Sequence, residues 1–398
     1  MKKNKKILFA ALFCMGVFTS CDVKNEDILF QQTKKQLHVE YNQEKESKNI
    51  SKDNKEKFKA VWVPVMEYKY ILQDKSKEEF ENEADKMIEN ISNDGYNAIF
   101  LHVRAYGDAY YKTDLCTKGS YLTDDSIDVL AYIADKAHEK NIEVHAWINP
   151  LRCQSESGME KMSDDYTIKK WYADSDSNGK YIVDVNGTYW LNPAYEEVRK
   201  YIADVSSEIC RNYSIEGLHI DDFFYPTTDE DFDRQAFSES GYSSLAEFRL
   251  QQTNLLVKSV YDAVKNTDNN IIFSISPQGN MKGNYNSQYS DVKKWCSESG
   301  YCDMIIPQLY YGFKNETCPF TDMVQLWRNL TTCKDVSLCI GICNYKDGLE
   351  DKFAGTGINE WIENRNITSQ ETEYVLNQEN IYGYSIYSYT AKYHKKQP

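Results

Sequence analysis

Residues 217–226 have the sequence GLHIDDFFYP. Side chains alternate between the two faces of a β-strand, so Leu218 and Ile220 share one face while His219 and Asp221 share the other. We expect the aliphatic pair to pack outward against helices and the polar pair to point into a barrel. Asp222 then falls on the rim of that barrel, where the following turn sets its direction.

Seven further apolar runs resemble this one in length, and helical patterns separate them. The eight predicted strands cover residues 60–65, 98–104, 143–149, 217–221, 271–276, 304–310, 337–343 and 383–389. Strands that alternate with helices predict a parallel sheet, and eight repeats favour a (β/α)8 TIM barrel over an open doubly wound sheet. No GxGxxG motif follows the first run, so the sequence gives no reason to expect a dinucleotide or any other cofactor.

The helical patterns have recognisable ends. An apolar stripe at helical spacing covers residues 80–91 and stops at Gly95, a residue typical of helix C-caps. A second stripe covers residues 127–137. A third helix is predicted to begin at Asn192 as N-cap, with Pro193 in its first turn. The connections at residues 150–191 and 222–243 are long, and at the active-site end of a barrel they would form the walls of a substrate cleft.

The N-terminus has the pattern of an export signal. A basic start is followed by an apolar run of twelve residues, 7–18, which is too short for a permanent membrane span. The segment Val17-Phe18-Thr19-Ser20-Cys21 resembles a bacterial lipoprotein cleavage box. We therefore expect a signal peptide over residues 1–20, a lipidated Cys21 with a flexible tether over residues 21–57, and a single catalytic domain over residues 58–398.

These features predict an extracytoplasmic lipoprotein of the cell envelope that is attached to the membrane through its lipid anchor. The alternative is an ordinary secretory signal that leaves Cys21 as a plain thiol. The chain carries a net charge of -15, and loss of the four lysines of the signal makes it -15 - 4 = -19. Such an acidic protein repels phosphate backbones, so we expect no nucleic acid partner. Neutral or N-acetylated sugars remain compatible with this charge.

The cysteines favour neither a metal nor a complete set of disulfides. Of the 11 cysteines, Cys14 and Cys21 lie in the export signal, which leaves nine. An odd number in an exported chain implies at least one free thiol. No CxxC motif is paired with another, and the Glu143 and His145 pair lacks a third ligand, so no metal site is predicted.

The pair Asp221-Asp222 is the strongest candidate for catalysis. Glycoside hydrolysis needs one carboxyl group to protonate the leaving oxygen and another to stabilise or trap the oxocarbenium-like transition state, and aromatic rings to stack on sugars. A loop-capping acidic pair is the structural alternative. The second catalytic carboxyl group is expected from Asp222, then from Asp108, then from the acidic loop at residues 229–233.

The same alternation along the strands selects polar and aromatic residues that would contact a sugar. Buried polar groups need partners, so their convergence at one end of a barrel predicts a polar pocket. These expected substrate-binding residues are Arg104, His145, Trp147, Asn149, His219, Tyr225, Gln308 and Tyr310. For His219, orientation of Asp221 is a second expected role.

Several longer segments, taken together, resemble one protein family. They are AVWVPV (60–65), YNAIFLHVRAYGDAYY (96–111), HEKNIEVHAWINPLR (138–152), WLNPAYEEVRKYI (190–202), IEGLHIDDFFYP (215–226), FSISPQG (273–279) and DMIIPQLYYG (303–312). In this order they resemble the bacterial glycosyl-hydrolase-like family ten. The resemblance implies a (β/α)8 barrel that hydrolyses glycosidic bonds in a polysaccharide, in some relatives peptidoglycan glycan strands, with Asp221 as a central acidic residue.

The sequence therefore predicts an anchored, monomeric glycosidase whose partners are a glycan and, through the lipid, a membrane. In this hypothesis Asp221 is the nucleophile or charge-stabilising base, and Asp222 or Asp108 supplies the proton. A non-catalytic glycan-binding lipoprotein on the same barrel is the alternative, because an obvious second carboxyl group is missing. Deacetylation of sugars is a further alternative, which would require a metal.

Overall fold

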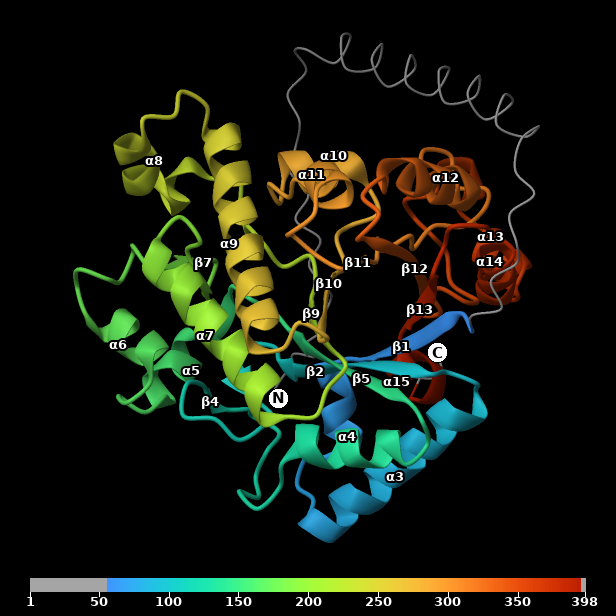
Figure 1. Cartoon of the computed structure of the whole chain (residues 1–398), viewed down its shortest axis with the longest axis horizontal. Coiled ribbons are helices and arrows are strands. Elements are labelled where there is room, and N and C mark those ends of the chain that lie inside the picture. The colour runs from blue at the N-terminus through green and yellow to red at the C-terminus, as the bar shows by residue number, and fades with distance from the viewer. Residues whose placement is uncertain (1–55, 395–398) are drawn as a thin grey trace, which may run out of the picture. The chain divides into compact units, whose positions relative to one another are not determined.

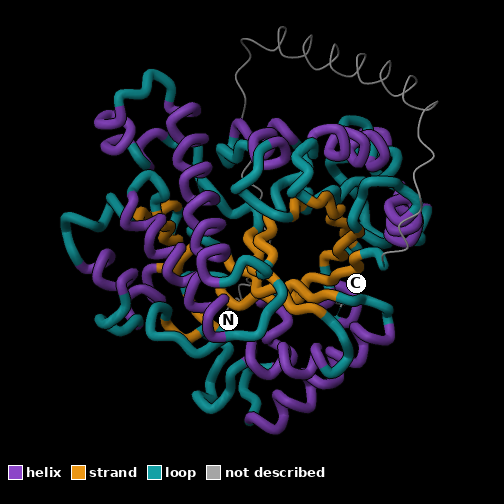
Figure 2. The backbone as a smooth tube through the Cα atoms, in the orientation of Figure 1, coloured by secondary structure: helices purple, strands orange, loops and turns teal. Residues whose placement is uncertain are grey.

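The computed structural model describes residues 56–394, and within them eight parallel strands close into a barrel (Figures 1 and 2). The strands are β1 (Phe58–Val63), β2 (Ala98–Arg104), β5 (Glu143–Ile148), β9 (Gly217–Ile220), β10 (Ile272–Ile275), β11 (Met304–Ile305), β12 (Ser337–Cys343) and β13 (Gly383–Tyr387). The ring closes because β1 pairs with β2 on one side and with β13 on the other. This confirms the predicted (β/α)8 barrel, with all eight strands within the predicted runs or shifted by two residues.

Helices surround the barrel and fill the connections between its strands (Figure 2). The α-helices are α2 (Tyr68–Ile71), α3 (Lys77–Asn93), α4 (Val129–His138), α5 (Glu156–Lys161), α6 (Thr167–Ala173), α7 (Glu196–Asn212), α8 (Arg234–Ser240), α9 (Leu245–Thr267), α10 (Met281–Asn286), α11 (Val292–Ser297), α12 (Phe320–Leu330), α13 (Glu360–Glu363), α14 (Ile367–Leu376) and α15 (Tyr389–Tyr393). Three short 3-10 turns are η1 (Val65–Glu67), η2 (Glu230–Phe232) and η3 (Gly355–Gly357).

Of the two helix ends predicted from the sequence, one agrees with the structure. Helix α3 is followed by Gly95, whose φ of 75° is the left-handed conformation expected after a helix. The second predicted stripe lies on α4 except for Ile127, which precedes this helix. The prediction that Asn192 caps the third helix is wrong, because α7 begins at Glu196. The Asn192 side chain instead forms a turn, in which its Oδ1 accepts a hydrogen bond from the Ala194 amide at 3.1 Å.

The two long connections have structure of their own. Residues 150–191 contain α5, α6 and a three-stranded antiparallel sheet in the order β6 (Arg152–Ser155), β8 (Thr188–Leu191) and β7 (Ile182–Val185). The connection after β9 is held by Arg249 of α9, which forms a fully buried ion pair with Asp233 at 2.6 Å. A two-stranded sheet of β3 (Asp108–Ala109) and β4 (Thr117–Lys118) lies in the connection after β2.

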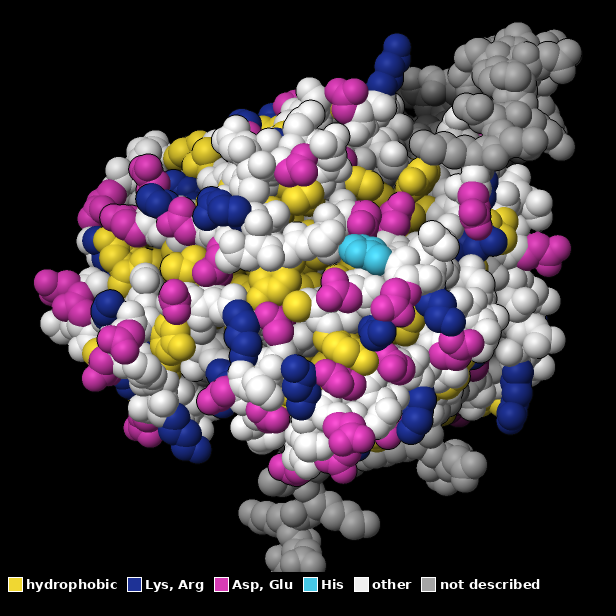
Figure 3. Space-filling model, turned by 60° about the horizontal axis from the view of Figure 1, so that its bottom comes forward, with side chains coloured by type: hydrophobic (Ala, Val, Ile, Leu, Met, Phe, Trp, Pro, Cys, Tyr) yellow, Lys and Arg dark blue, Asp and Glu magenta, His cyan; other side chains and the backbone are white. Residues whose placement is uncertain are grey.

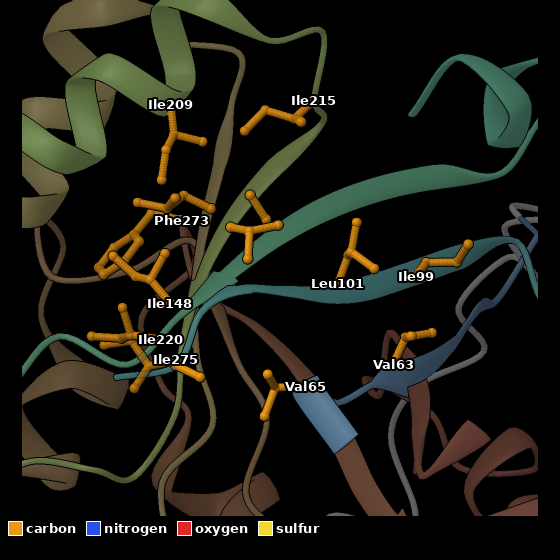
Figure 4. Packing of buried hydrophobic residues seen from close by; sticks show 14 of the residues in the cluster. Val63, Val65, Ile99, Leu101, Ile148, Ile209, Ile215, Ile220, Phe273 and Ile275 are labelled. Carbon is orange, nitrogen blue, oxygen red and sulfur yellow. The ribbon is translucent and has the colours of Figure 1, made fainter. Parts of the chain in front are cut away.

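The main core lies between the barrel and its helices. Ile220, Ile148 and Ile275 of neighbouring strands point outward into this layer, as do Ile99 and Leu101 (Figure 4). A second core fills the barrel itself with residues from alternate positions: Phe58, Trp62, Ala98, Phe100, Trp147, Met304 and Cys339. The outward direction of Ile220 confirms the predicted alternation on β9.

The signal peptide, Cys21 and nearly all of the tether lie outside the described residues, so their predictions are not tested here. Within residues 56–394, no helix combines the length and the apolar character needed to cross a bilayer. On the face drawn in Figure 3, Lys and Arg side chains are scattered among Asp and Glu side chains.

Candidate active site

Asp221 follows the last residue of β9 and lies buried at the carboxyl end of the barrel. Its Oδ2 accepts a hydrogen bond from Nε1 of Trp147 at 3.1 Å, and its Oδ1 accepts one from the Phe223 amide at 3.3 Å. Burial, and then the neighbouring charge of Asp222, raise the pKa of Asp221 well above its usual value. This environment favours the protonated form of the carboxyl group over the carboxylate.

Asp222 is half-buried and has a different set of partners. Its Oδ1 accepts a hydrogen bond from Nε2 of Gln308 at 3.0 Å, and its Oδ2 accepts one from Nε2 of Gln288 at 3.2 Å. Burial raises the pKa of Asp222, whereas these amide donors oppose the rise by stabilising the anion. Two carboxyl groups whose environments separate their pKa values are the usual arrangement for acid–base chemistry. Asp222 is therefore the group that ionises first.

His219 lies one layer deeper in the barrel and does not contact Asp221. Its Nδ1 is 2.8 Å from Oγ of Ser274, and its Nε2 is 3.0 Å from Oγ of Ser276 and 3.3 Å from the Trp62 indole nitrogen. Trp62 can only donate, so Nε2 accepts and Nδ1 carries the proton. Burial lowers the pKa of His219 well below its usual value, which leaves a neutral ring. The orientation of Asp221, expected of His219, is provided by Trp147.

Trp147 is itself held by a stacked histidine that the sequence did not select as a site residue. The His102 and Trp147 rings are nearly parallel, with centroids 3.7 Å apart. Burial lowers the pKa of His102 to about 3, so this ring is also neutral. The arrangement fixes the indole whose N–H group reaches Asp221.

Arg104 and Asn149 hold the chain where β2 and β5 end. The Arg104 guanidinium is fully buried and donates through Nη1 to the carbonyl oxygens of Asn149 and Pro150. Asn149 Nδ2 donates to the Ala105 carbonyl oxygen at 3.3 Å. These bonds join the ends of the two strands that carry His102 and Trp147. Arg104 and Asn149 therefore hold the stacked pair of rings in position.

Three of the predicted site residues are not brought to Asp221 and Asp222. Asp108 accepts hydrogen bonds from the Ala105 and Tyr106 amides at 3.1 and 2.8 Å and so shapes its own turn. His145 lies near the amino ends of the strands, with its ring 5.6 Å from that of Phe58. Tyr225 faces away from the carboxyl pair, and the Arg249 guanidinium carbon lies 5.1 Å from its ring centroid.

The acidic loop at residues 229–233 also has structural partners. Asp229 caps η2, Asp231 pairs with Arg234, and Asp233 pairs with Arg249. Among residues 56–394, the hydrogen bonds and ion pairs of these acids connect them to their own connection and to α9. Asp222 is therefore the one candidate for the second carboxyl group that adjoins Asp221.

A group of tyrosines lies beside the carboxyl pair, and only Tyr310 was predicted. Its ring stacks on Tyr387 with centroids 5.9 Å apart, and Tyr345 meets both rings edge-on at 6.0 and 6.2 Å. Burial, followed by the charges of Asp221 and Asp222, raises the pKa of Tyr387. Gly383, Ser385 and Tyr387 occupy alternate positions of β13 and so share one face of the strand. The alternation rule that selected Tyr310 could therefore also have selected Tyr387.

Arg152 is a second residue that the sequence did not select. It is the first residue of β6, and its guanidinium carbon lies 4.7 Å from the ring centroid of Tyr106 and 5.2 Å from that of Phe223. Trp190 stacks on Phe223 with centroids 6.2 Å apart. These aromatic residues come from three different connections at the carboxyl end of the barrel.

The described residues contain no group of three or more His, Cys, Asp or Glu side chains arranged to hold a metal ion. The nine cysteines between residues 56 and 394 are free thiols, and seven of them are buried. The site described here is thus made of two carboxyl groups, amide donors and aromatic rings.

A carboxyl pair at the carboxyl end of a (β/α)8 barrel, lined by aromatic residues, is characteristic of glycoside hydrolase-like proteins. The family model for "Glycosyl hydrolase-like 10" matches residues 57–354, and the chain belongs to this family. This confirms the family suggested by the sequence motifs.

Two curated relatives and one solved structure are similar to this chain, the structure in its fold alone. The chain is 27% identical over 298 residues to the glycosyl hydrolase YngK of Bacillus subtilis (strain 168), covering 68% of this chain and 57% of that protein. It is 23% identical over 308 residues to the glycosyl hydrolase DigH of Escherichia coli (strain K12), covering 71% of this chain and 69% of that protein. The glycoside hydrolase domain of PgaB (BpsB) from Bordetella bronchiseptica has a similar fold, with a TM-score of 0.54 at 11% identity over 85% of this chain and 96% of that domain.

Proposed function

We propose that the protein hydrolyses O-glycosidic bonds in a polysaccharide of the cell envelope, such as the glycan strands of peptidoglycan. The observation that carries this proposal is the unequal environment of the two adjacent acids, with Asp221 held by Trp147 and Asp222 held by Gln308 and Gln288. Burial and the charge of Asp222 favour the protonated form of Asp221, whereas the two amide donors favour the anion of Asp222, so the pair can supply both the acid and the carboxylate that glycoside hydrolysis needs.

In this mechanism Asp221 protonates the leaving glycosidic oxygen, and the Asp222 carboxylate stabilises the positive charge that develops on the sugar ring. Water then adds to the anomeric carbon and gives up a proton to the Asp221 carboxylate, which restores both groups. This assignment reverses the roles inferred from the sequence, because the raised pKa of Asp221 suits an acid better than a nucleophile. Tyr310, Tyr345 and Tyr387 supply rings on which a sugar can stack.

We also propose that the protein acts outside the cytoplasm as a monomer anchored by lipid on Cys21. The motif at residues 17–21 and the basic, then apolar, start of the chain support this part of the proposal. Metabolic labelling with a fatty acid, compared between the native chain and Cys21→Ala, tests it. Equal labelling of both proteins would contradict the anchor.

The activity is tested by incubating the protein with peptide-free peptidoglycan strands and a panel of neutral polysaccharides while new reducing ends are measured. We expect Asp221→Asn and Asp222→Asn each to lower kcat by at least about 100-fold. Asp204→Asn, which changes an exposed acid of α7 paired with Lys200, is the matched control and should retain activity. Saturable glycan binding without any product would instead favour a non-catalytic glycan-binding protein.

A further inference from the structure

Arg152 lies in an aromatic box that we define by Tyr106, Trp190 and Phe223. Its guanidinium carbon is 4.7, 5.9 and 5.2 Å from the respective ring centroids. Tyr106 comes from the connection after β2, Trp190 from β8, and Phe223 from the connection after β9. Three separate parts of the chain therefore converge on one cation.

The cation in this box lacks a protein anion. Between residues 56 and 394, no Asp or Glu oxygen lies within ion-pair distance, 4.0 Å, of Arg152, and its buried Nε has no hydrogen-bond partner. A buried N–H group without an acceptor is costly, and Nε of Arg152 is such a group. An acceptor from outside the protein would remove this cost.

Arg249 provides an internal comparison for Arg152. It also lies over two aromatic rings, at 5.1 Å from Tyr225 and 5.0 Å from Tyr289. In its case the protein supplies the anion, because both Asp233 oxygens lie within 3.1 Å of Arg249 nitrogens. Arg152 thus has the same aromatic surroundings as Arg249, with the carboxylate missing.

The aromatic box lies next to Asp221 and Asp222, and Arg152 forms no ion pair with either acid. The amide of Phe223, a ring of the box, donates to Asp221 Oδ1 at 3.3 Å. The charge of Arg152 also acts on His102, the ring that stacks on Trp147. A sugar bound at Asp221 would therefore have Arg152 close by, and the charge on Arg152 is not neutralised by either catalytic acid.

We propose that Arg152 and the aromatic box form a subsite for the carboxylate of an acidic sugar, so that the glycan substrate carries carboxyl groups. The inference rests on the proposed glycoside hydrolase function and specifies its substrate class. A planar guanidinium matches a carboxylate with two parallel hydrogen bonds, and the stacked Trp190 and Phe223 rings provide a face for the sugar ring. The net charge of -15 opposes the binding of anions elsewhere on the surface, whereas Arg152 supplies one local positive charge for a carboxylate next to the acids.

The test compares matched glycans that differ only in the carboxylate. The probes are peptide-free peptidoglycan strands, which carry a lactyl carboxylate, and hyaluronan oligosaccharides, which carry a uronic acid carboxylate. Each is used intact and after chemical reduction of its carboxyl groups to alcohols. A preference for the peptidoglycan strands would indicate recognition of the lactyl carboxylate, and a preference for hyaluronan would indicate recognition of a carboxylate on the sugar ring.

We expect Arg152→Gln to lower kcat/KM on the preferred intact glycan by about 10- to 100-fold, mainly through KM. The native protein should lose a similar factor on the reduced glycan, and Arg152→Gln should lose nothing further there. Arg152→Lys should lose less than Arg152→Gln, because the charge is kept and the two-pronged geometry is lost. Arg211→Gln, at an exposed arginine of α7, is the control and should match the native protein.

Equal loss on intact and reduced glycans would overturn the inference, because Arg152 would then act only by holding the aromatic rings. Thermal unfolding of the native protein and of Arg152→Gln shows whether the variant is folded, and equal midpoints exclude misfolding as the cause of the loss. If Arg152→Gln does not fold, Arg152→Lys takes its place in the comparison of intact and reduced glycans. If no glycan is cleaved, the proposed hydrolase function fails. Glycan binding then tests the subsite, and equal affinity for intact and reduced strands would overturn it.

Discussion

The indole nitrogen of Trp147 and Oδ2 of Asp221 lie 3.1 Å apart, and this hydrogen bond joins the ends of the neighbouring strands β5 and β9. The bond stabilises the Asp221 carboxylate and so opposes the rise in its pKa caused by burial. It is the one side-chain hydrogen bond that Asp221 receives from residues 56–394. The position and the ionisation of this acid therefore depend on this indole together with the Phe223 amide, which donates to Oδ1.

Trp147→Phe removes this donor and keeps an aromatic ring for His102 to stack on. The pKa of Asp221 should rise further, so the loss of activity at alkaline pH should move to higher pH, because Asp221 acts in its protonated form. We expect kcat to fall about tenfold, the rate equivalent of one hydrogen bond. A pH–rate profile measures both effects. Trp171→Phe, in α6, is the control, and an unshifted alkaline limb in Trp147→Phe would contradict the assigned role of Asp221.

Gln308→Leu should shift the acidic limb of the pH–rate profile. Its Nε2 donates to Oδ1 of Asp222 at 3.0 Å, and this bond favours the anion. Without it the pKa of Asp222 should rise, and activity at acidic pH should fall because the carboxylate forms only at higher pH. Gln288→Leu should cause a similar shift through Oδ2. An alkaline-limb shift in place of an acidic one would contradict the roles proposed for the two acids.

Asp233→Asn tests the connection that follows Asp222. The Asp233 and Arg249 side chains are fully buried, so removal of the negative charge leaves an unpaired guanidinium in the core. We expect the free energy of unfolding to fall by about 3 to 5 kcal/mol, as measured by urea denaturation. The exposed pair of Asp231 and Arg234 is the matched control, and Asp231→Asn should leave stability unchanged within error. Similar losses in both variants would contradict the structural role of the buried pair.

Glu371 of α14 should make the protein less stable as pH rises. Its side chain is fully buried, and neither oxygen has a hydrogen-bond partner within residues 56–394. Burial, followed by the charges of Glu360 and Asp347, raises the pKa of Glu371 well above its usual value, and Lys346 opposes this. The folded state therefore holds a proton that the unfolded state releases above about pH 4.3, and stability falls as pH rises from there.

Glu371→Gln should remove this dependence because glutamine resembles the protonated acid. We expect the variant to unfold at a higher temperature than the native protein at pH 8, with a much smaller difference at pH 4.5. Thermal unfolding at both pH values measures this. Glu373→Gln, at an exposed position of the same helix, is the control. A variant less stable than the native protein at pH 8 would contradict the buried, protonated state.

Alternation along the strands was sufficient to predict the barrel and the inward direction of Asp221, Trp147 and Gln308. Alternation could not predict how far along the barrel axis an inward side chain lies. His145 and Trp147 share a face of β5, but only Trp147 lies at the carboxyl end. Depth depends on the register between strands, such as His145 opposite Gly217, which a single sequence does not encode locally. The position of Asp108 was also not predictable, since its amide partners come from a turn.

For a different reason, Arg152 was not predicted, and Trp190 was expected only as part of the cleft wall formed by residues 150–191. They lie on an antiparallel sheet within the connection after β5, where no barrel alternation applies. Their contacts with Tyr106 and Phe223 depend on how three connections fold over one another. Such contacts arise from tertiary packing and have no periodic signal in the sequence.

The strands β6, β8 and β7 pair with one another and with no strand of the barrel, so this sheet begins and ends within one connection. We therefore expect residues 152–191 to tolerate exchange between related barrels if their core contacts are kept, while Asp221 and Asp222 after β9 stay in place. Glycan preference and bond cleavage would then be inherited separately, and a chimera that carries another relative's cassette should keep the reaction and change the sugar it selects.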